Sequence, residues 1–177
     1  MRMRSDVVAA ERDNPNTAAE PSRAVSKGLV PTIRTIEKTF RFDAGHRSLG
    51  FDYTKEETIH GHTWELKLIV ECRQKLDDMK TIFDTNELNV ITRPIIDSLD
   101  HSFIIWTEDP IFDAFVKVCE LAGVADKVYP VDFNPTIEGM VEHIFNRVDE
   151  QLELDGCTLK RAELRCASTL NACYEVG

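Results

Sequence analysis

Three of the five histidines in this 177-residue chain are spaced as metal ligands. His60 and His62 flank a glycine in an HGH tripeptide, and residues two apart on an extended segment point to the same side. His46 ends the preceding strand-like segment on its apolar side, so a hairpin can bring it beside the pair. Three neutral imidazoles with no cysteine nearby are typical of a catalytic zinc site whose fourth position is open. The competing interpretation is a plain turn next to one buried histidine.

Two further groups are candidates for proton transfer. Asp100 precedes His101, and a carboxylate beside an imidazole can fix its tautomer and raise its basicity. The alternative is a histidine stabilised by the end of a helix. Glu56 and Glu57 lie just before HGH and are either a general base or a solvated acidic loop. His143 falls on the polar side of a predicted helix, where we expect a solvated residue.

Hydrophobic periodicity predicts the elements that must position these residues. Strand-like alternation covers residues 36–46 and 62–72. Helical patterns with recognisable start signals follow, at about 84–99, 110–122 and 135–152. Two more strands are expected at about 159–167 and 172–176. This order predicts an α+β fold, in which helices pack on one face of an antiparallel sheet.

Composition sets the boundaries of the domain and excludes some classes of partner. Residues 1–35 have no aromatic side chain and no apolar periodicity, so we expect a disordered N-terminal extension before a single domain over 36–177. The net charge of −10 argues against a nucleic-acid partner. No apolar run approaches the roughly 18 residues that a membrane helix needs. The five cysteines form no CxxC pair, which favours reduced thiols and a cytoplasmic location.

Together these motifs resemble the 6-pyruvoyltetrahydropterin synthase and 6-carboxytetrahydropterin synthase family. The likeness covers nearly all of residues 36–176. It is carried by FDAGHR, HGHTWELKLIV, IFDTNEL, SLDHSF, NPTIE and a closing hairpin that ends in Tyr174. The resemblance implies the tunnelling fold (T-fold), a four-stranded antiparallel sheet with helices on one side, assembled as a homohexamer. Residues 107–133 look like a helical insertion found in some members.

The resemblance also implies a chemistry and a set of residues for it. Zinc would be bound by His46, His60 and His62. The small-molecule substrate would be 7,8-dihydroneopterin triphosphate, cleaved by a lyase reaction. Asp100 and His101 would relay a proton, and Thr136 and Glu138 would help to line the pterin pocket.

Two positions depart from the family pattern. The usual base is a cysteine a few residues before HGH, which this chain lacks. Glu57, three residues before His60, resembles a subgroup in which glutamate replaces that cysteine and the product is 6-hydroxymethyl-7,8-dihydropterin; Glu56 is the alternative. Cys166 stands where members carry a glutamate that anchors the pterin, and a thiol lacks the two acceptor oxygens of a carboxylate.

Three functions therefore compete. The first is a zinc-dependent lyase that acts on 7,8-dihydroneopterin triphosphate. The second keeps the zinc lyase machinery but takes a non-pterin small molecule, as the change at Cys166 favours. The third is a non-catalytic binding or regulatory homologue. A triphosphate near so acidic a chain needs a local basic cluster, for which Arg47 and Lys55 are the candidates.

Overall fold

The fold is described from a computed structural model, which covers residues 32–50 and 55–177. The predicted extension over residues 1–35 falls almost wholly outside the described residues. Its last two positions already belong to the first strand, which begins at Arg34. Within the described ranges, no helix is both long and apolar enough to cross a membrane.

Four strands form the antiparallel sheet that the sequence predicts. They are β1 (Arg34–His46), β2 (His60–Cys72), β5 (Cys157–Ala167) and β6 (Leu170–Glu175). Each pairs antiparallel with the next, in the order β1-β2-β5-β6. β2 starts two residues earlier than its alternation predicts, so the whole HGH tripeptide lies in the strand.

The predicted strand count of four is too low, because the sheet has six strands within the residues that the structure describes. β3 (Ser102–Trp106) pairs parallel with the end of β1, and β4 (Val128–Val131) pairs parallel with β3. Both are short apolar runs without alternation, which periodicity alone does not separate from buried helix or loop. The segment predicted as a helical insertion thus contributes β4 as well as α2 (Phe112–Leu121) and the short turn η2 (Ala125–Lys127).

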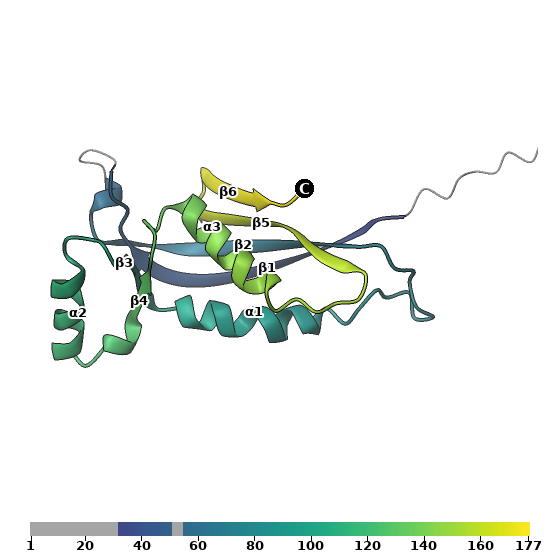
Figure 1. Cartoon of the computed structure of the whole chain (residues 1–177), viewed down its shortest axis with the longest axis horizontal. Helices are drawn as coiled ribbons and strands as arrows, with labels where there is room; N and C mark the ends of the chain where they lie inside the picture. The colour runs from purple at the N-terminus through teal and green to yellow at the C-terminus, as the bar shows by residue number, and fades with distance from the viewer. Residues whose placement is uncertain (1–31, 51–54) are drawn as a thin grey trace, which may run out of the picture. The chain divides into compact units, whose positions relative to one another are not determined.

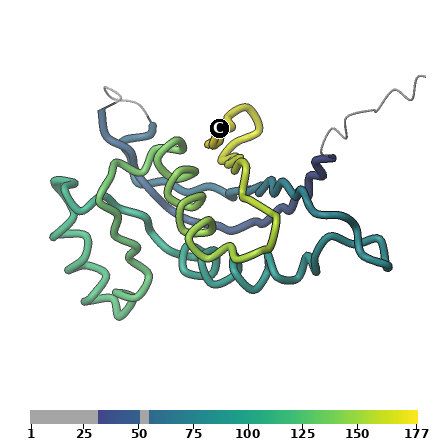
Figure 2. The backbone as a smooth tube through the Cα atoms, turned by 45° about the vertical axis from the view of Figure 1, so that its right-hand side comes forward, coloured from purple at the N-terminus to yellow at the C-terminus, as the bar shows by residue number. Residues whose placement is uncertain are grey.

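Two helices cover the inner face of the sheet, as predicted. These are α1 (Asn86–Leu99) and α3 (Ile137–Asp149), which run alongside β1, β2 and β5 in Figure 1 and again in Figure 2. Their apolar sides pack on alternate residues of the strands, such as Phe40, Trp64 and Leu164, all nearly inaccessible to solvent. The opposite, outer face of the sheet carries the intervening polar and charged residues.

One cysteine pair contradicts the expectation of reduced thiols. Cys72 ends β2 directly opposite Cys157 at the start of β5, and the two form a disulfide. Pairing across a sheet depends on strand register, which the spacing of cysteines in the sequence does not reveal. Cys119, Cys166 and Cys173 are free. The pairing weakens the argument from cysteines for a cytoplasmic location.

Candidate metal centre

The hairpin of β1 and β2 brings the three predicted histidines together. His46 lies opposite His60 in the strand register, and Ala44 lies opposite His62, so all three side chains project from the inner face. Their ring centroids are separated by 4.5 Å (His46–His60), 4.8 Å (His60–His62) and 5.2 Å (His46–His62). The spacing argument from HGH and His46 therefore gives the observed cluster.

Each histidine of the cluster has a buried Nε2 atom without a hydrogen-bond partner. Two of the rings are fixed through their other nitrogen. His46 Nδ1 lies 2.9 Å from the Pro135 carbonyl oxygen, and His60 Nδ1 lies 2.8 Å from the Thr58 carbonyl oxygen. A carbonyl oxygen only accepts hydrogen bonds, so both Nδ1 atoms donate. Carbonyl partners of this kind orient metal-binding histidines and leave Nε2 free as the ligand atom.

Burial favours the neutral form of two of these rings, His46 and His62. Desolvation, reinforced by the neighbouring His60 and His62 rings and partly opposed by the hydrogen bond to Pro135, lowers the pKa of His46 to about 4. Burial also lowers the pKa of His62, and His60 lowers it further. A neutral imidazole has the free electron pair that a metal ion needs.

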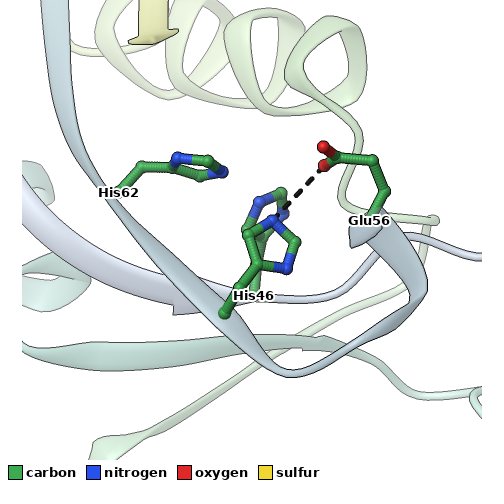
Figure 3. Close-up of side chains that lie close together, drawn as sticks. His46, Glu56 and His62 are labelled. Carbon is green, nitrogen blue, oxygen red and sulfur yellow. Dashed lines mark ion pairs between the residues drawn. The ribbon is translucent and has the colours of Figure 1, made fainter. Parts of the chain in front are cut away.

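Glu56 joins the histidines, and Glu57 does not. The 3₁₀ turn η1 (Lys55–Glu57) brings Glu56 Oε2 to 3.3 Å from His60 Nε2, and Figure 3 shows the carboxylate directed at the cluster. Glu57 Oε1 instead accepts a hydrogen bond of 3.0 Å from the Gly50 backbone N–H. Glu56, the alternative replacement for the family's cysteine, is therefore the glutamate that lies beside the candidate ligands.

These residues fit a divalent metal ion. The candidate ligand atoms of His46, Glu56, His60 and His62 all lie within 4.8 Å of one another. Two ligands of one tetrahedral zinc ion lie about 3.4 Å apart when each bond is about 2.1 Å. Three unpartnered imidazole nitrogens beside one carboxylate are the nitrogen and oxygen donors that zinc prefers.

A cavity of about 250 Å³ opens beside the cluster and gathers the predicted substrate residues. It is lined by His46, Ser48, Glu56, Thr136, Ile137, Glu138, Cys166 and Leu170. Thr136 is also the N-cap of α3, since its hydroxyl accepts from the Gly139 N–H at 3.2 Å. Burial first, and then the Glu56 and Glu138 carboxylates, raise the pKa of the Cys166 thiol, which is therefore uncharged near neutral pH.

Two residues that we did not single out hold the cavity wall in place. The Asn134 side chain accepts from the Leu49 N–H at 2.9 Å and donates to the Leu49 carbonyl at 2.9 Å. The Pro135 carbonyl receives the Ser48 hydroxyl at 3.0 Å as well as the His46 ring. Asn134 and Pro135 therefore hold the end of β1 and the residues that follow it against the start of α3. An Asn-Pro dipeptide is typical of a helix start, and nothing in it predicts a contact so distant along the chain.

Asp100 and His101 pair with each other but do not reach this cavity. Asp100 Oδ2 lies 2.8 Å from His101 Nδ1, and the Asp43 N–H, which donates to Asp100 Oδ1, is the main cause of a lowered Asp100 pKa. The His101 side chain is 73% exposed. Together with Asp43, Thr63 and His62 it lines a separate open hollow of about 530 Å³. His101 has a positive φ of 57°, an uncommon conformation for a residue with a Cβ.

The structure corrects two sequence expectations, one for Arg47 and one for His143. Arg47 Nε lies 3.1 Å from the buried carboxylate of Asp109, so its charge is already neutralised and is not directed at the cavity. His143 is half-buried rather than solvated, and its Nε2 lies 3.0 Å from the Tyr129 hydroxyl. Both partners, Asp109 and Tyr129, come from the segment 107–133, and these contacts depend on the path of that segment through space.

A family model and a relative of known name both match most of this chain. The family model described as 6-pyruvoyl tetrahydropterin synthase matches residues 35–177. A 6-carboxy-5,6,7,8-tetrahydropterin synthase of Aquifex aeolicus is 33% identical in an alignment of 135 residues, which covers 68% of this chain and 82% of that protein.

Two solved structures have a similar fold. An uncharacterized protein of Wolinella succinogenes superposes with a TM-score of 0.71 at 21% identity, over 81% of this chain and 98% of that one. A Plasmodium vivax 6-pyruvoyltetrahydropterin synthase gives 0.60 at 15% identity, over 81% and 97%. The latter is described as a catalytic residue mutant in which a glutamate is changed to alanine.

Proposed function

This chain belongs to the 6-pyruvoyl tetrahydropterin synthase family, and from that premise we propose that it is a zinc-dependent lyase acting on 7,8-dihydroneopterin triphosphate. One observation carries the proposal: three buried, unpartnered imidazole nitrogens converge beside a cavity that also holds Glu56, Thr136 and Glu138. The name of the Aquifex aeolicus relative favours a 6-carboxy product. The cytoplasmic location remains a prediction.

His46, His60 and His62 would hold the zinc ion. When bound, it would act as a Lewis acid that polarises a hydroxyl of the substrate side chain. The lowered pKa values of His46 and His62 support this role, as do the carbonyl partners of His46 and His60. The Trp64 ring packs edge-on against His46 and His62, with centroids 5.0 and 5.5 Å away, and limits their movement.

Glu56 is the best-placed base for removing a proton from the substrate. It lines the cavity, whereas the Glu57 carboxylate accepts from the Gly50 N–H. We therefore assign to Glu56 the role that the sequence first favoured for Glu57. The solved Plasmodium vivax relative, whose description names a glutamate as a catalytic residue, supports a carboxylate in this role.

The Asp100–His101 pair would serve the site of a neighbouring copy. His101 is exposed and does not line the cavity that holds Glu56 and Glu138, and its own open hollow joins Asp43 and Thr63 of the outer face to His62. Along β1, only Ala44–His46 pair with β3, which leaves one edge of residues 34–43 without a strand partner among the described residues. Such an edge favours assembly of copies, and the resemblance implies a homohexamer.

A second candidate function follows from Cys166. Its neutral thiol lies in the cavity wall where the family's pterin-anchoring carboxylate is expected, and the described residues lining that cavity include two glutamates and no lysine or arginine. This lining favours a ligand rich in hydrogen-bond donors over a polyanion. The second candidate is therefore a zinc lyase of the same fold for a non-pterin small molecule. A non-catalytic homologue is the third, which a lack of turnover would favour.

A product assay tests the proposal. Zinc-loaded protein is incubated with 7,8-dihydroneopterin triphosphate, and products are identified by mass spectrometry, with Glu56→Ala and Glu57→Ala as paired variants. We expect a pterin product that Glu56→Ala abolishes and Glu57→Ala retains. If neither wild-type protein nor Cys166→Glu binds or turns over the pterin while zinc is bound, the pterin assignment is wrong and the second candidate replaces it.

A further inference from the structure

The contact between Glu56 and His60 does not have the geometry of a hydrogen bond. The two atoms, Glu56 Oε2 and His60 Nε2, lie 3.3 Å apart, yet His60 Nε2 has no hydrogen-bond partner. Because His60 Nδ1 donates to the Thr58 carbonyl, Nε2 is the ring nitrogen that is left to bind a metal ion. A metal ion bound between Nε2 and the Glu56 carboxylate would give both atoms a partner.

The remaining histidines point to the same location for that cation. The Nε2 atoms of His46 and His62 are also buried without partners. The ligand atoms of all four residues lie within 4.8 Å of one another, and Figure 3 shows Glu56 approaching from the side opposite His62. We propose that Glu56 is a fourth protein ligand of the metal, so that a His₃Glu set closes the resting site; this rests on the proposed function.

The backbone around Glu56 is arranged to present this one carboxylate. The Ser48 N–H donates to the Glu56 carbonyl at 2.8 Å, and the Thr58 hydroxyl donates to the Lys55 carbonyl at 2.6 Å. The first bond fixes η1 against the segment that follows β1, and the second closes the turn itself. Glu57, the next residue, is oriented toward the Gly50 N–H instead. The two adjacent glutamates therefore form a matched pair, of which only one reaches the cluster.

A carboxylate as fourth ligand would make substrate entry depend on a change in the Glu56 side chain, while η1 stays in place. The Glu56 side chain must withdraw before a substrate oxygen can take its place next to the histidines. The withdrawn carboxylate then lies beside the substrate, where it can accept a proton. Glu56 would thus be a ligand in the resting protein and a base in the substrate complex.

Metal affinity and a spectroscopic signal test the proposal without measuring turnover. The full chain is prepared as wild type, E56Q, E56D and E57Q, and each zinc dissociation constant is measured by chelator competition at one pH. We expect E56Q to weaken zinc binding by at least about 10- to 100-fold, the range found when a residue supporting a metal ligand is removed. E56D keeps the charge and should lie between E56Q and wild type. E57Q should match wild type.

Cobalt(II) provides the second readout, because its visible absorption depends on the ligands around the ion. E56Q should change the spectrum, whereas E57Q should reproduce that of wild type. If E56Q binds zinc as wild type does and leaves the cobalt spectrum unchanged, Glu56 is not a ligand, and the proposed lyase function is unaffected. If wild type itself binds neither metal, both the four-ligand site and the zinc dependence of the proposed function are wrong. A thermal melt of each metal-free variant confirms that it is folded.

Discussion

The two ends of strand β2 differ in whether their side-chain atoms have a bonding partner. β2 begins at His60, where three histidine nitrogens are buried without partners, and it ends at Cys72, which is joined covalently to Cys157. Between these ends the inner face is apolar and fully packed. One strand therefore carries polar atoms left open for a ligand at its start and a closed crosslink at its end.

This difference indicates that metal binding depends on one end of β2 and the free energy of unfolding on the other. A buried polar atom without a partner costs folding free energy, so a protein keeps several such atoms together only where a ligand satisfies them. The disulfide has the opposite effect, since it restricts the unfolded chain across a separation of 85 residues. Changes at the histidine end should alter metal binding, and changes at the cysteine end should alter the free energy of unfolding.

The largest expected effect is loss of metal when one histidine ligand is removed. His62→Ala should weaken zinc binding by more than about 100-fold, above the range for residues that only support a ligand. The metal-free variant should unfold at nearly the same denaturant concentration as metal-free wild type, because the lost packing on Trp64 is offset by removal of a buried nitrogen that has no partner. Chelator competition and urea titration measure the two quantities. A variant that lost stability but kept its zinc affinity would contradict this inference about the two ends of β2.

The converse change removes the crosslink. Replacing Cys72 and Cys157 together by alanine should lower the free energy of unfolding by about 2–4 kcal/mol, the typical contribution of a disulfide. Zinc affinity of the folded variant should stay within about two-fold of wild type, since the metal centre lies at the other end of β2. Cys173→Ala, at an exposed free cysteine, is the control and should change neither quantity. Urea unfolding of the metal-free proteins gives the free energies.

Sequence reasoning succeeded where a side chain's position follows from strand alternation. His46, His60 and His62 converge because alternation and a hairpin require it, and Thr136 and Glu138 line the cavity because they begin α3. It failed where position depends on register or on the path of a long connection. The disulfide, the two parallel strands and the partner of Arg47 all depend on such tertiary geometry.

The choice between Glu56 and Glu57 marks the limit of the sequence argument. Both lie in the same turn, and a spacing of three or four residues before His60 is compatible with reaching a neighbouring ring. Only the hydrogen bonds of η1 decide which carboxylate faces the cluster. The site on the inner face was thus predictable from the sequence, but the choice of its fourth member was not.

Two glycines at the histidine end of β2 allow a direct comparison of how tightly the backbone is packed there. Gly45 and Gly61 face each other across β1 and β2. A Cβ added at Gly45 would lie 2.7 Å from the Phe103 ring, whereas one added at Gly61 would meet its nearest atom, the Ala44 oxygen, at 3.4 Å. Gly45→Ala should therefore cost about 1–3 kcal/mol of stability, as overpacking does. Gly61→Ala should cost less, and urea unfolding of the two metal-free variants compares them directly.

The smallest expected effect comes from His143, a histidine whose nitrogen does have a partner. Arg147 donates to the Tyr129 hydroxyl at 2.6 Å, which leaves that hydroxyl to donate to His143 Nε2 at 3.0 Å. Burial, followed by the charge of Arg147 and partly opposed by Asp132, lowers the pKa of His143 below its ordinary value of 6.5. The unfolded chain therefore binds this proton first as the pH falls, and the folded state loses stability below about pH 6.5.

His143→Gln removes that titration but keeps a polar side chain next to Tyr129. The free energy of unfolding of metal-free protein should fall less steeply between pH 7.5 and 5.5 in this variant than in wild type, because the other histidines contribute equally to both. Zinc affinity should not change, since His143 lies outside the ligand cluster. Equal slopes for the two proteins would show that protonation of His143 is not linked to unfolding. A loss of zinc affinity would mean that His143 influences the metal-binding histidines. That result would contradict the inference that metal binding depends only on the histidine end of β2.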